Sequence, residues 1–419
     1  MSKFKIYHAE PIFGEVEISG AKNAVLPLMA SALMSDGKCE LQGVPALKDV
    51  EVMGSLLRSI GAEVVEDFEN GRIEIRGEIS AVEAPLEPVR QMRASIAVMG
   101  PLLAKAGRAK VPLPGGCAIG ARPIGLHLKG FKALGAVIKE SAGFVEARAD
   151  RLKGANIYLD FPSVGATENI IMAAVLADGA TVLENAAEEP EIVDLANFLN
   201  KMGAKIKGAG TDTIKIEGVE RLGAAKHTVI PDRIETGTFM IAAAITRGRV
   251  SVKNMVPDHV KPIIAKLREC GVEVEEFDDS VLVDAEGKEL VATEIKTLPY
   301  PGFPTDMQPQ FMSLLTTVKG SSAIIETVFE RRYRHVGELN RMGARITTEG
   351  NLARIPGGTK LVGAKVLATD LRAGAAMALA GMAAKGVTEI SEIFHIERGY
   401  SDFMGKLGQL GVRIERKAD

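Results

Sequence analysis

The sequence has few cysteines and lacks the common short motifs for metals and nucleotides. Its three cysteines, Cys39, Cys117 and Cys270, are odd in number and show no Cys-x-x-Cys spacing. This usage fits free thiols in a reducing compartment rather than a disulfide framework or a zinc site. There is also no His-Glu-x-x-His sequence, no Gly-x-Gly-x-x-Gly after a strand and no phosphate loop ending in Gly-Lys-Ser or Gly-Lys-Thr. We therefore predict no metal site and neither of those nucleotide folds.

Apolar runs of membrane length and an excess of positive charge are missing as well. The most apolar stretch, residues 373–384, is bounded by Arg372 and Lys385 and falls short of the roughly 20 residues that a membrane helix needs. Residues 1–17 contain no apolar run of signal-peptide length. The net charge of -3 lacks the basic excess of general nucleic-acid binders. We expect a cytoplasmic protein with no membrane or nucleic-acid partner, and no feature indicates an oligomeric state.

What the sequence does contain is a sixfold repeat. An apolar residue, two variable residues and a second apolar residue precede a glycine, and Val or Ile follows three residues later. The six glycines are Gly61, Gly135, Gly203, Gly271, Gly343 and Gly411. Each is predicted to end a helix, because glycine adopts positive φ at little cost. Another helix lies upstream in each copy and is predicted to end at Gly37, Gly107, Gly179, Gly248, Gly320 or Gly386.

The repeat predicts an α/β fold with helices inside and sheets outside. Each unit reads as helix, strand, helix, strand over about 70 residues. The first helix is apolar all round, as in residues 24–34 and 373–384, which is typical of a buried helix. Strands such as residues 72–76 and 213–217 alternate charged and apolar residues, so one sheet face meets water. Six units predict two domains of three units, with a boundary near residues 227–231.

One loop interrupts the repeat and carries a thiol. Residues 111–123 are rich in glycine and proline around Cys117, and Arg122 follows. A reachable thiol beside an arginine is a candidate for chemistry. The alternative is a small loop residue without a chemical role, which we expect for Cys39 and Cys270.

Six cations fall at predicted helix starts or loop edges rather than on outer helix faces: Lys22, Arg93, Arg122, Arg332, Arg372 and Arg398. A cation at a helix start favours an anionic ligand, because the free N–H groups there are already positive. Taken alone, each is more often a solvated charge or a structural ion pair. Asp306 opens another predicted helix and is a candidate either for a helix cap or for a general base.

These residues resemble the enolpyruvyl transferases over nearly the whole chain, and in particular those that act on UDP-N-acetylglucosamine. The motifs that carry the resemblance are residues 20–23, 92–95, 114–123, 163–167, 231–237, 303–306, 369–372 and 395–400. The resemblance implies a two-domain inside-out α/β barrel of six repeated units. The N-terminal domain would be residues 22–229 with the cysteine loop, residues 111–123. The catalytic C-terminal domain would be residues 1–21 plus 230–419, and the active site would lie in a cleft closed by the loop.

The resemblance further implies transfer of the enolpyruvyl group of phosphoenolpyruvate to the 3-hydroxyl of UDP-N-acetylglucosamine, the first committed step of peptidoglycan precursor synthesis. Cys117 would be the acid and Asp306 the base, with no metal and no cofactor, and fosfomycin would alkylate Cys117. Lys22, Arg122 and Arg398 would hold phosphoenolpyruvate, with Arg372 nearby, and Lys22 and Arg398 would also be catalytic. Asn23, Arg93, Asp306 and Arg332 would contact the sugar or its diphosphate. The nucleotide pocket would be lined by Pro123, Ile124, Gly125, Leu126, Ser163, Val164 and Val328.

One departure and two alternatives accompany this interpretation. Some relatives have a lysine before the Ser-Val-Gly-Ala motif, where this chain has Phe161, so one diphosphate contact of the family is missing. The alternatives are 3-phosphoshikimate 1-carboxyvinyltransferase, which lacks the cysteine loop, and an inactive paralogue that binds the sugar nucleotide and regulates a partner.

Overall fold

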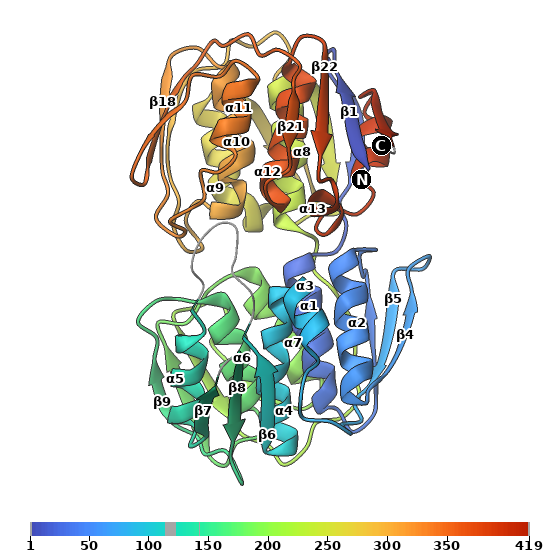
Figure 1. Cartoon of the computed structure of the whole chain (residues 1–419), viewed down its shortest axis with the longest axis vertical. Coiled ribbons are helices and arrows are strands. Elements are labelled where there is room, and N and C mark those ends of the chain that lie inside the picture. Colours follow the sequence, from blue (N-terminus) through green and yellow to red (C-terminus); the bar gives the residue numbers. More distant parts are fainter. Residues whose placement is uncertain (1, 114–122, 142, 418–419) are drawn as a thin grey trace. The chain divides into compact units, whose positions relative to one another are not determined.

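The computed structural model describes residues 2–113, 123–141 and 143–417, and the chain forms two compact units (Figure 1). Within these ranges the C-terminal unit comprises residues 2–19 and 231–417, and the N-terminal unit comprises the remaining residues from 20 to 230. Within the described residues the chain passes from one unit to the other at residues 19–20 and at residues 230–231.

The N-terminal unit contains three sheets, ordered β13-β3-β5-β4, β6-β8-β7 and β11-β12-β10-β9. Its strands are β3 (Lys38–Gln42), β4 (Glu63–Asp67), β5 (Arg72–Arg76), β6 (Arg108–Pro112), β7 (Val137–Ser141), β8 (Phe144–Arg148), β9 (Asn156–Tyr158), β10 (Ala180–Glu184), β11 (Lys205–Lys207), β12 (Thr213–Glu217) and β13 (Lys226–Thr228). Its α-helices and 3₁₀ helices are α1 (Lys22–Ser31), η1 (Ala32–Met34), α2 (Lys48–Ile60), α3 (Leu86–Gln91), η2 (Arg93–Val98), α4 (Met99–Ala106), α5 (Gly125–Ala133), α6 (Val164–Ala174) and α7 (Pro190–Lys201).

The C-terminal unit also contains three sheets, ordered β21-β22-β1-β23, β15-β16-β14-β2 and β17-β18-β20-β19. Its strands are β1 (Lys3–Tyr7), β2 (Phe13–Glu17), β14 (Arg249–Lys253), β15 (Glu273–Glu276), β16 (Ser280–Asp284), β17 (Glu294–Lys296), β18 (Ser321–Ile325), β19 (Thr347–Glu349), β20 (Leu352–Pro356), β21 (Lys365–Leu367), β22 (Val387–Ser391) and β23 (Ile414–Lys417). Its helices are α8 (Arg233–Thr246), η3 (Pro257–Val260), α9 (Lys261–Glu269), η4 (Thr305–Met307), α10 (Gln308–Thr317), α11 (Val336–Arg341), α12 (Leu371–Ala383), α13 (Phe394–Glu397) and α14 (Phe403–Gln409).

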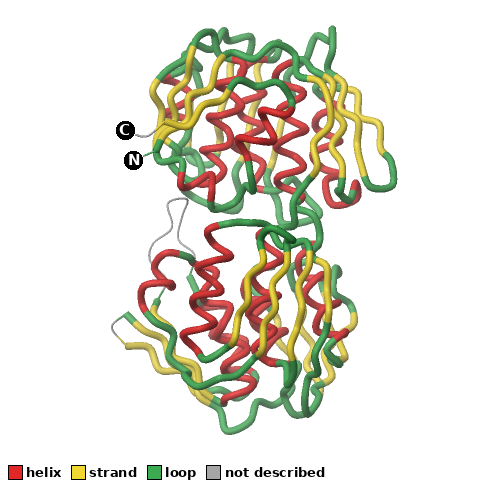
Figure 2. Tube along the Cα trace, turned by 90° about the vertical axis from the view of Figure 1, so that its right-hand side faces the viewer, coloured by secondary structure: helices red, strands yellow, loops and turns green. Residues whose placement is uncertain are grey.

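In both units helices fill the centre and sheets form the outside, as Figure 2 shows. In the C-terminal unit α8, α10 and α12 pack on one another, and nearly every residue of these helices is buried. In the N-terminal unit α4 packs on α6 and on η1, the continuation of α1. The predicted inside-out α/β class is therefore confirmed. Among the described helices, none combines the length and apolar character that crossing a membrane would require.

The repeat contains more strands than the sequence pattern predicted. In five of the described sheets the strand after the central helix pairs antiparallel with the second strand of a hairpin, as β3 pairs with β5 and β14 with β16. A parallel strand covers the other edge in five sheets, for example β13 beside β3. In the sixth sheet a single bridge between Glu83 and Lys110 takes that place. The predicted helix, strand, helix, strand order left no place for these partners, although residues 72–76 and 213–217 were themselves recognised as strands. Tight hairpins and short edge strands lack the period of the helices.

The two N-terminal strands complete sheets of the C-terminal unit. β1 lies between β22 and β23 and pairs antiparallel with both. It occupies the position that the second hairpin strand has in the other repeats. β2 pairs parallel with β14. Residues close to both ends of the described chain therefore hold one sheet together.

The glycines predicted to end the second helix of each repeat all adopt positive φ, between 89° and 118°. Of the six glycines predicted to end the upstream helices, only Gly107 directly follows its helix. The other five helices end earlier, so the prediction was wrong for Gly37, Gly179, Gly248, Gly320 and Gly386. At the end of α8, Arg247 rather than Gly248 takes the left-handed conformation, with φ of 58°. A side chain at position 248 would lie 2.1 Å from the Ile12 carbonyl oxygen. Gly248 is thus required by the close approach of the segment that enters β2.

A buried ion pair fixes the segment at the first crossing between the units. Lys406 on α14 bonds to the Glu235 carboxylate and, at 2.6 Å, to the Ser19 hydroxyl. The Glu235 side chain is 2% exposed and that of Lys406 is 13% exposed. Burial raises the pKa of Glu235 to about 7, although Lys406 opposes the shift. Since this pKa is higher than the unfolded value of 4.5, the contribution of Glu235 to stability is full below that value and is lost as the pH rises through about 7.

We expect Lys406→Met to destabilise the protein by about 3 to 5 kcal/mol at pH 8, because it leaves a buried carboxylate without its counter-charge. The loss should be clearly smaller at pH 5.5, where Glu235 takes up a proton and becomes neutral. Urea unfolding of the full chain at both pH values measures the difference. Lys385→Met, at an exposed lysine of the same unit, is the matched control and should cost little at either pH. An equal loss for Lys406→Met at both pH values would contradict the assignment.

Candidate active site

Asp306 is held between two buried arginines of the C-terminal unit. Its Oδ1 accepts a hydrogen bond from Nη2 of Arg332 at 3.0 Å, and its Oδ2 accepts one from Nε of Arg372 at 3.1 Å. Asp306 precedes α10, Arg332 precedes α11, and Arg372 lies in the first turn of α12. Both arginine side chains are 2% exposed. This aspartate–arginine cluster (Asp306, Arg332 and Arg372) places two cations on one carboxylate, and the buried carboxylate of Asp232 also stabilises the charge of Arg372.

The cluster retains unused hydrogen-bond donors. Nη1 and Nη2 of Arg372 and Nε of Arg332 are buried and have no hydrogen-bond partner within the part of the chain that the structure describes. Burial opposes the charge of Arg372, but Tyr400 and Asp306 outweigh it and raise the pKa of Arg372 above its ordinary value. Buried donors are almost always paired in folded proteins. A charged guanidinium with both terminal nitrogens unused is therefore suited to bind an anion through two parallel hydrogen bonds.

Glu326 organises the segments that carry this cluster, and sequence reasoning missed it. Its buried carboxylate accepts hydrogen bonds from the Thr297 and Thr305 hydroxyls at 2.8 and 2.9 Å. It also accepts from the backbone N–H groups of Val328 and Phe329 at 2.9 and 3.2 Å. Thr305 adjoins Asp306 in sequence, and the Val328 turn leads to Arg332. A charged residue directly after the apolar strand β18 was the available signal.

Two further predictions concern the same unit. Asp306 does not cap α10, because the N-cap residue is Met307 and no side chain caps it. The helix cap is instead found at Asp370, whose carboxylate accepts from the N–H groups of Arg372 and Ala373 at 3.0 and 3.1 Å. Arg398 directly follows α13 and is half-buried. Burial and the charge of Arg398 lower the pKa of neighbouring His395.

In the N-terminal unit the first residue of α1 is a buried cation. Lys22 Nζ lies 2.5 Å from Asp49 Oδ2, and the two side chains are 10% and 3% exposed. No side chain caps α1 and no acidic residue lies in its first turn. Asn23 is the second residue, and Pro27 removes the N–H that would otherwise bond to the Asn23 carbonyl. The start of α1 thus carries a buried cation that is paired with Asp49, at a helix end whose dipole favours an anionic ligand.

Arg93 and His127 lie close together in the same unit. Burial and the charge of Arg93 lower the pKa of His127 to about 4, so this histidine is neutral near pH 7. Its Nδ1 lies 2.9 Å from Asn169 Nδ2. Because the amide nitrogen can only donate, Nδ1 accepts and the ring proton is on Nε2. His127 therefore adds a neutral donor beside the Arg93 cation.

Most of the residues predicted for the nucleotide pocket lie around the starts of α5 and α6, whereas Val328 lies in the C-terminal unit between β18 and α11. Pro123, Ile124, Gly125 and Leu126 precede or begin α5 and are half-buried or exposed. Ser163 caps α6, because its Oγ accepts from the Ala166 N–H at 3.4 Å, and Val164 is the first helical residue.

Where some relatives have a lysine, the Phe161 side chain is 42% exposed. The preceding Asp160 binds Lys129 of α5 at 2.8 Å.

Cys117 and Arg122 lie outside the described residues, so their predicted roles rest on the sequence. The other two cysteines are buried. Burial, and to a smaller degree Glu269, raises the pKa of Cys270 to about 12, so that thiol stays protonated. Neither thiol has the accessibility of a reactive cysteine.

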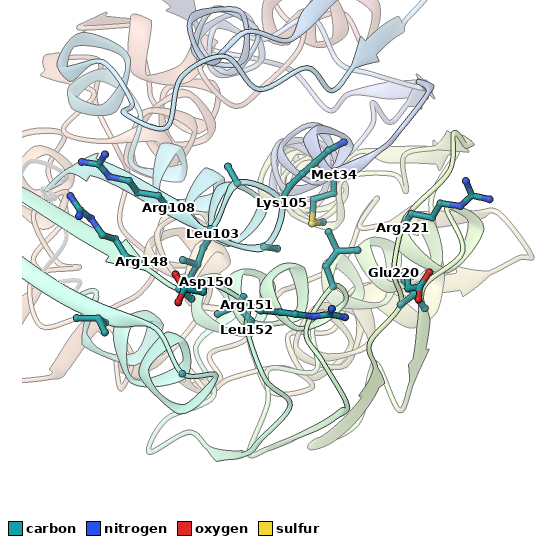
Figure 3. A pocket seen from close by; sticks show the side chains of 18 of the residues that line it. Met34, Leu103, Lys105, Arg108, Arg148, Asp150, Arg151, Leu152, Glu220 and Arg221 are labelled. Carbon is teal, nitrogen blue, oxygen red and sulfur yellow. The ribbon is translucent and has the colours of Figure 1, made fainter.

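A cavity of about 1180 Å³ in the N-terminal unit contains none of the predicted site residues. It lies at the ends of η1, α4 and α6 and is lined by Met34, Gly107 and Leu176, among others (Figure 3). Arg108 and Arg148 lie side by side at one end and share Glu146 at 2.6 and 2.7 Å. Lys105 pairs with Asp36 at 3.2 Å. Since these basic groups are paired with acidic neighbours and no predicted site residue lines the cavity, the cavity is not the candidate site.

Comparison with known proteins identifies the family. The profile described as EPSP synthase (3-phosphoshikimate 1-carboxyvinyltransferase) matches residues 6–407. The chain belongs to this family of enolpyruvyl transferases. The predicted resemblance is thereby confirmed.

Three enolpyruvyl transferases share most of the sequence. UDP-N-acetylglucosamine 1-carboxyvinyltransferase 1 of Caldanaerobacter subterraneus subsp. tengcongensis is 60% identical, over 99% of this chain and 100% of the relative. UDP-N-acetylglucosamine 1-carboxyvinyltransferase 2 of Carboxydothermus hydrogenoformans is also 60% identical, over 100% of both chains. UDP-N-acetylglucosamine 1-carboxyvinyltransferase of Finegoldia magna is 56% identical over 96% of both.

Solved structures of enolpyruvyl transferases share the fold. NikO from Streptomyces tendae superimposes with a TM-score of 0.90 at 24% identity and covers 100% of this chain and 99% of NikO. EPSP synthase from Acinetobacter baumannii gives a TM-score of 0.78 at 17% identity and full coverage of both chains. At these identities the likeness supports the fold class alone.

Proposed function

We propose that the protein transfers the enolpyruvyl group of phosphoenolpyruvate to the 3-hydroxyl of UDP-N-acetylglucosamine and releases phosphate. The main structural support for this proposal is the aspartate–arginine cluster. It combines a carboxylate with two buried cations whose remaining donors suit a phosphate or carboxylate group. The choice of acceptor is supported by relatives that are 56% to 60% identical and bear that enzyme's name.

The reaction needs one base and one acid. As the sugar hydroxyl attacks C2 of phosphoenolpyruvate, Asp306 takes the hydroxyl proton and the Cys117 thiol gives a proton to C3. The resulting tetrahedral intermediate carries both the sugar oxygen and the phosphate on C2. Loss of a C3 proton then re-forms the double bond while the C2–O bond to phosphate breaks. The C3 proton returns to the Cys117 thiolate, and the hydroxyl proton passes from Asp306 to the departing phosphate. The net products are therefore the enolpyruvyl ether and protonated phosphate.

The cationic residues bind and stabilise the anions in this scheme. Lys22, Arg122 and Arg398 hold the phosphate and carboxylate of phosphoenolpyruvate, and Arg372 lies nearby. Asn23, Arg93 and Arg332 contact the sugar or its diphosphate. The nucleotide is bound by residues 123–126, Ser163, Val164 and Val328. Fixed cations stabilise the charge that moves onto the leaving phosphate, in a reaction that we assign to peptidoglycan precursor synthesis in the cytoplasm.

Phosphate release with two acceptors tests the proposal. The purified full chain with phosphoenolpyruvate should release phosphate with UDP-N-acetylglucosamine and not with shikimate 3-phosphate. Turnover with shikimate 3-phosphate but not with UDP-N-acetylglucosamine would contradict the proposal and identify the protein as a 3-phosphoshikimate 1-carboxyvinyltransferase. Binding of UDP-N-acetylglucosamine without any turnover would instead indicate a regulatory paralogue.

A further inference from the structure

The guanidinium of Arg372 rests on the ring of Tyr400. The guanidinium carbon lies 5.3 Å from the ring centroid, within the range of a cation–π interaction. Tyr400 is 3% exposed, and its ring packs against Phe403 with centroids 5.1 Å apart. With Nε bonded to Asp306 and one face covered by Tyr400, the guanidinium is restrained on two sides.

The phenol oxygen of Tyr400 is itself fixed by two polar side chains. It lies 3.0 Å from Thr238 Oγ1 and 3.2 Å from Gln310 Nε2. The Thr238 hydroxyl proton is directed to the Ile234 carbonyl at 2.7 Å. Thr238 Oγ1 must therefore accept from the Tyr400 hydroxyl, and the Tyr400 oxygen in turn accepts from Gln310. This directional chain leaves the ring a single orientation.

The network joins all three central helices of the C-terminal unit. Thr238 belongs to α8, Gln310 to α10 and Arg372 to α12. Thr238 is 1% exposed and Gln310 is fully buried. Burying polar groups inside helices that are otherwise apolar carries a cost in free energy. Thr238 and Gln310 are not needed for apolar packing, but they are explained if their role is to fix the side chain of Tyr400.

We infer that Tyr400, held by Thr238 and Gln310, is a positioning residue that aims the two terminal nitrogens of Arg372 at the anionic substrate. The inference rests on the proposed function and adds residues that act through Arg372 without touching substrate. A restrained guanidinium loses less conformational freedom when the anion binds. The network should therefore strengthen binding of phosphoenolpyruvate and have little effect on the other substrate.

The test compares the KM for each substrate in two Tyr400 variants. Tyr400→Leu removes the ring and should raise the KM for phosphoenolpyruvate about tenfold. Tyr400→Phe keeps the ring but loses the hydroxyl, and should raise it about threefold. In both variants the KM for UDP-N-acetylglucosamine should stay within about twofold. The kcat should change little, because the ground state and the transition state should lose the same binding of phosphoenolpyruvate.

Phe239→Leu is the matched control. Phe239 is a buried aromatic residue on α8 whose ring neighbour is Phe403 rather than Tyr400. It should lower Tm as Tyr400→Leu does and leave the KM for phosphoenolpyruvate unchanged. Tyr400→Phe keeps the core packed and decides the question if the leucine variant does not fold.

Three outcomes would overturn the inference. A similar rise in KM for Phe239→Leu would show general loosening of the core. An unchanged KM in both Tyr400 variants would refute positioning while the wild-type turnover upheld the proposed function. Absence of wild-type turnover would remove the proposed function and this inference together.

Discussion

Asp306→Asn should lower kcat by about 100-fold to 10,000-fold, the usual effect of removing a general base. The single oxygen of asparagine can still accept a hydrogen bond from one of the two arginines, while its amide nitrogen faces the other. The amide cannot take a proton from the sugar hydroxyl. Steady-state phosphate release at saturating substrates measures the effect. Asp278→Asn, the same change at an exposed position of the same unit, should be silent. A variant that kept more than half of the wild-type kcat would exclude Asp306 as the base.

The same substitution also tests the charge of the cluster. Without the carboxylate, two arginines that are each 2% exposed lose their shared counter-charge, at a cost of about 3 kcal/mol. An anion that occupies the cluster should restore part of this loss. Inorganic phosphate is therefore expected to raise the Tm of Asp306→Asn more than that of the wild type. An equal rise in Tm for both proteins would show that phosphate binds outside the aspartate–arginine cluster.

Cys117→Ser should reduce kcat by a similar factor of about 100 to 10,000. A thiol with an ordinary pKa of about 8.5 holds its proton at neutral pH and releases it readily. A serine hydroxyl is a far weaker acid, so proton delivery to C3 of phosphoenolpyruvate should fail while substrate binding persists. Turnover that survives this substitution would show that another group supplies the proton.

Labelling with fosfomycin gives an independent readout of the same thiol. Mass spectrometry should find one adduct on the peptide that contains Cys117, and none in Cys117→Ser. Cys270→Ala is the control, because the pKa of Cys270 is raised to about 12 by burial and its thiol should not react. An adduct on Cys39 or Cys270 would contradict the assignment.

The sequence predicted the fold well where the repeat has a physical cause. Glycines such as Gly61 and Gly135 end helices through positive φ, which no other residue adopts as cheaply, and the pattern therefore marks all six units. The hairpin partners β5 and β12 were recognised as strands, but their place in the sheet depends on pairing across the repeat. Gly248 was misread because its reason is a tertiary contact with Ile12.

The candidate site was predictable only as a set of residue types. Helix starts with cations indicated Lys22 and Arg372, yet no local pattern indicates that Arg332 and Arg372 converge on Asp306, because they are 26 and 66 residues from it in the chain. Thr238 and Gln310 were overlooked although polar residues inside apolar helices were a visible signal. Their partners become evident only when three helices are packed together.

The placement of β1 between β22 and β23 bears on how the protein can be engineered. Lys3 lies directly opposite Lys417 in the ladder, so fusion tags at the two ends would crowd one another and the edge of the same sheet. Because Lys3 and Lys417 are ladder partners, a brief linker could also join the chain close to them, with new termini opened at an exposed turn such as residues 286–287. In such a circular permutant β1 would follow β23 directly in the chain, and the two strands are already neighbours in the sheet.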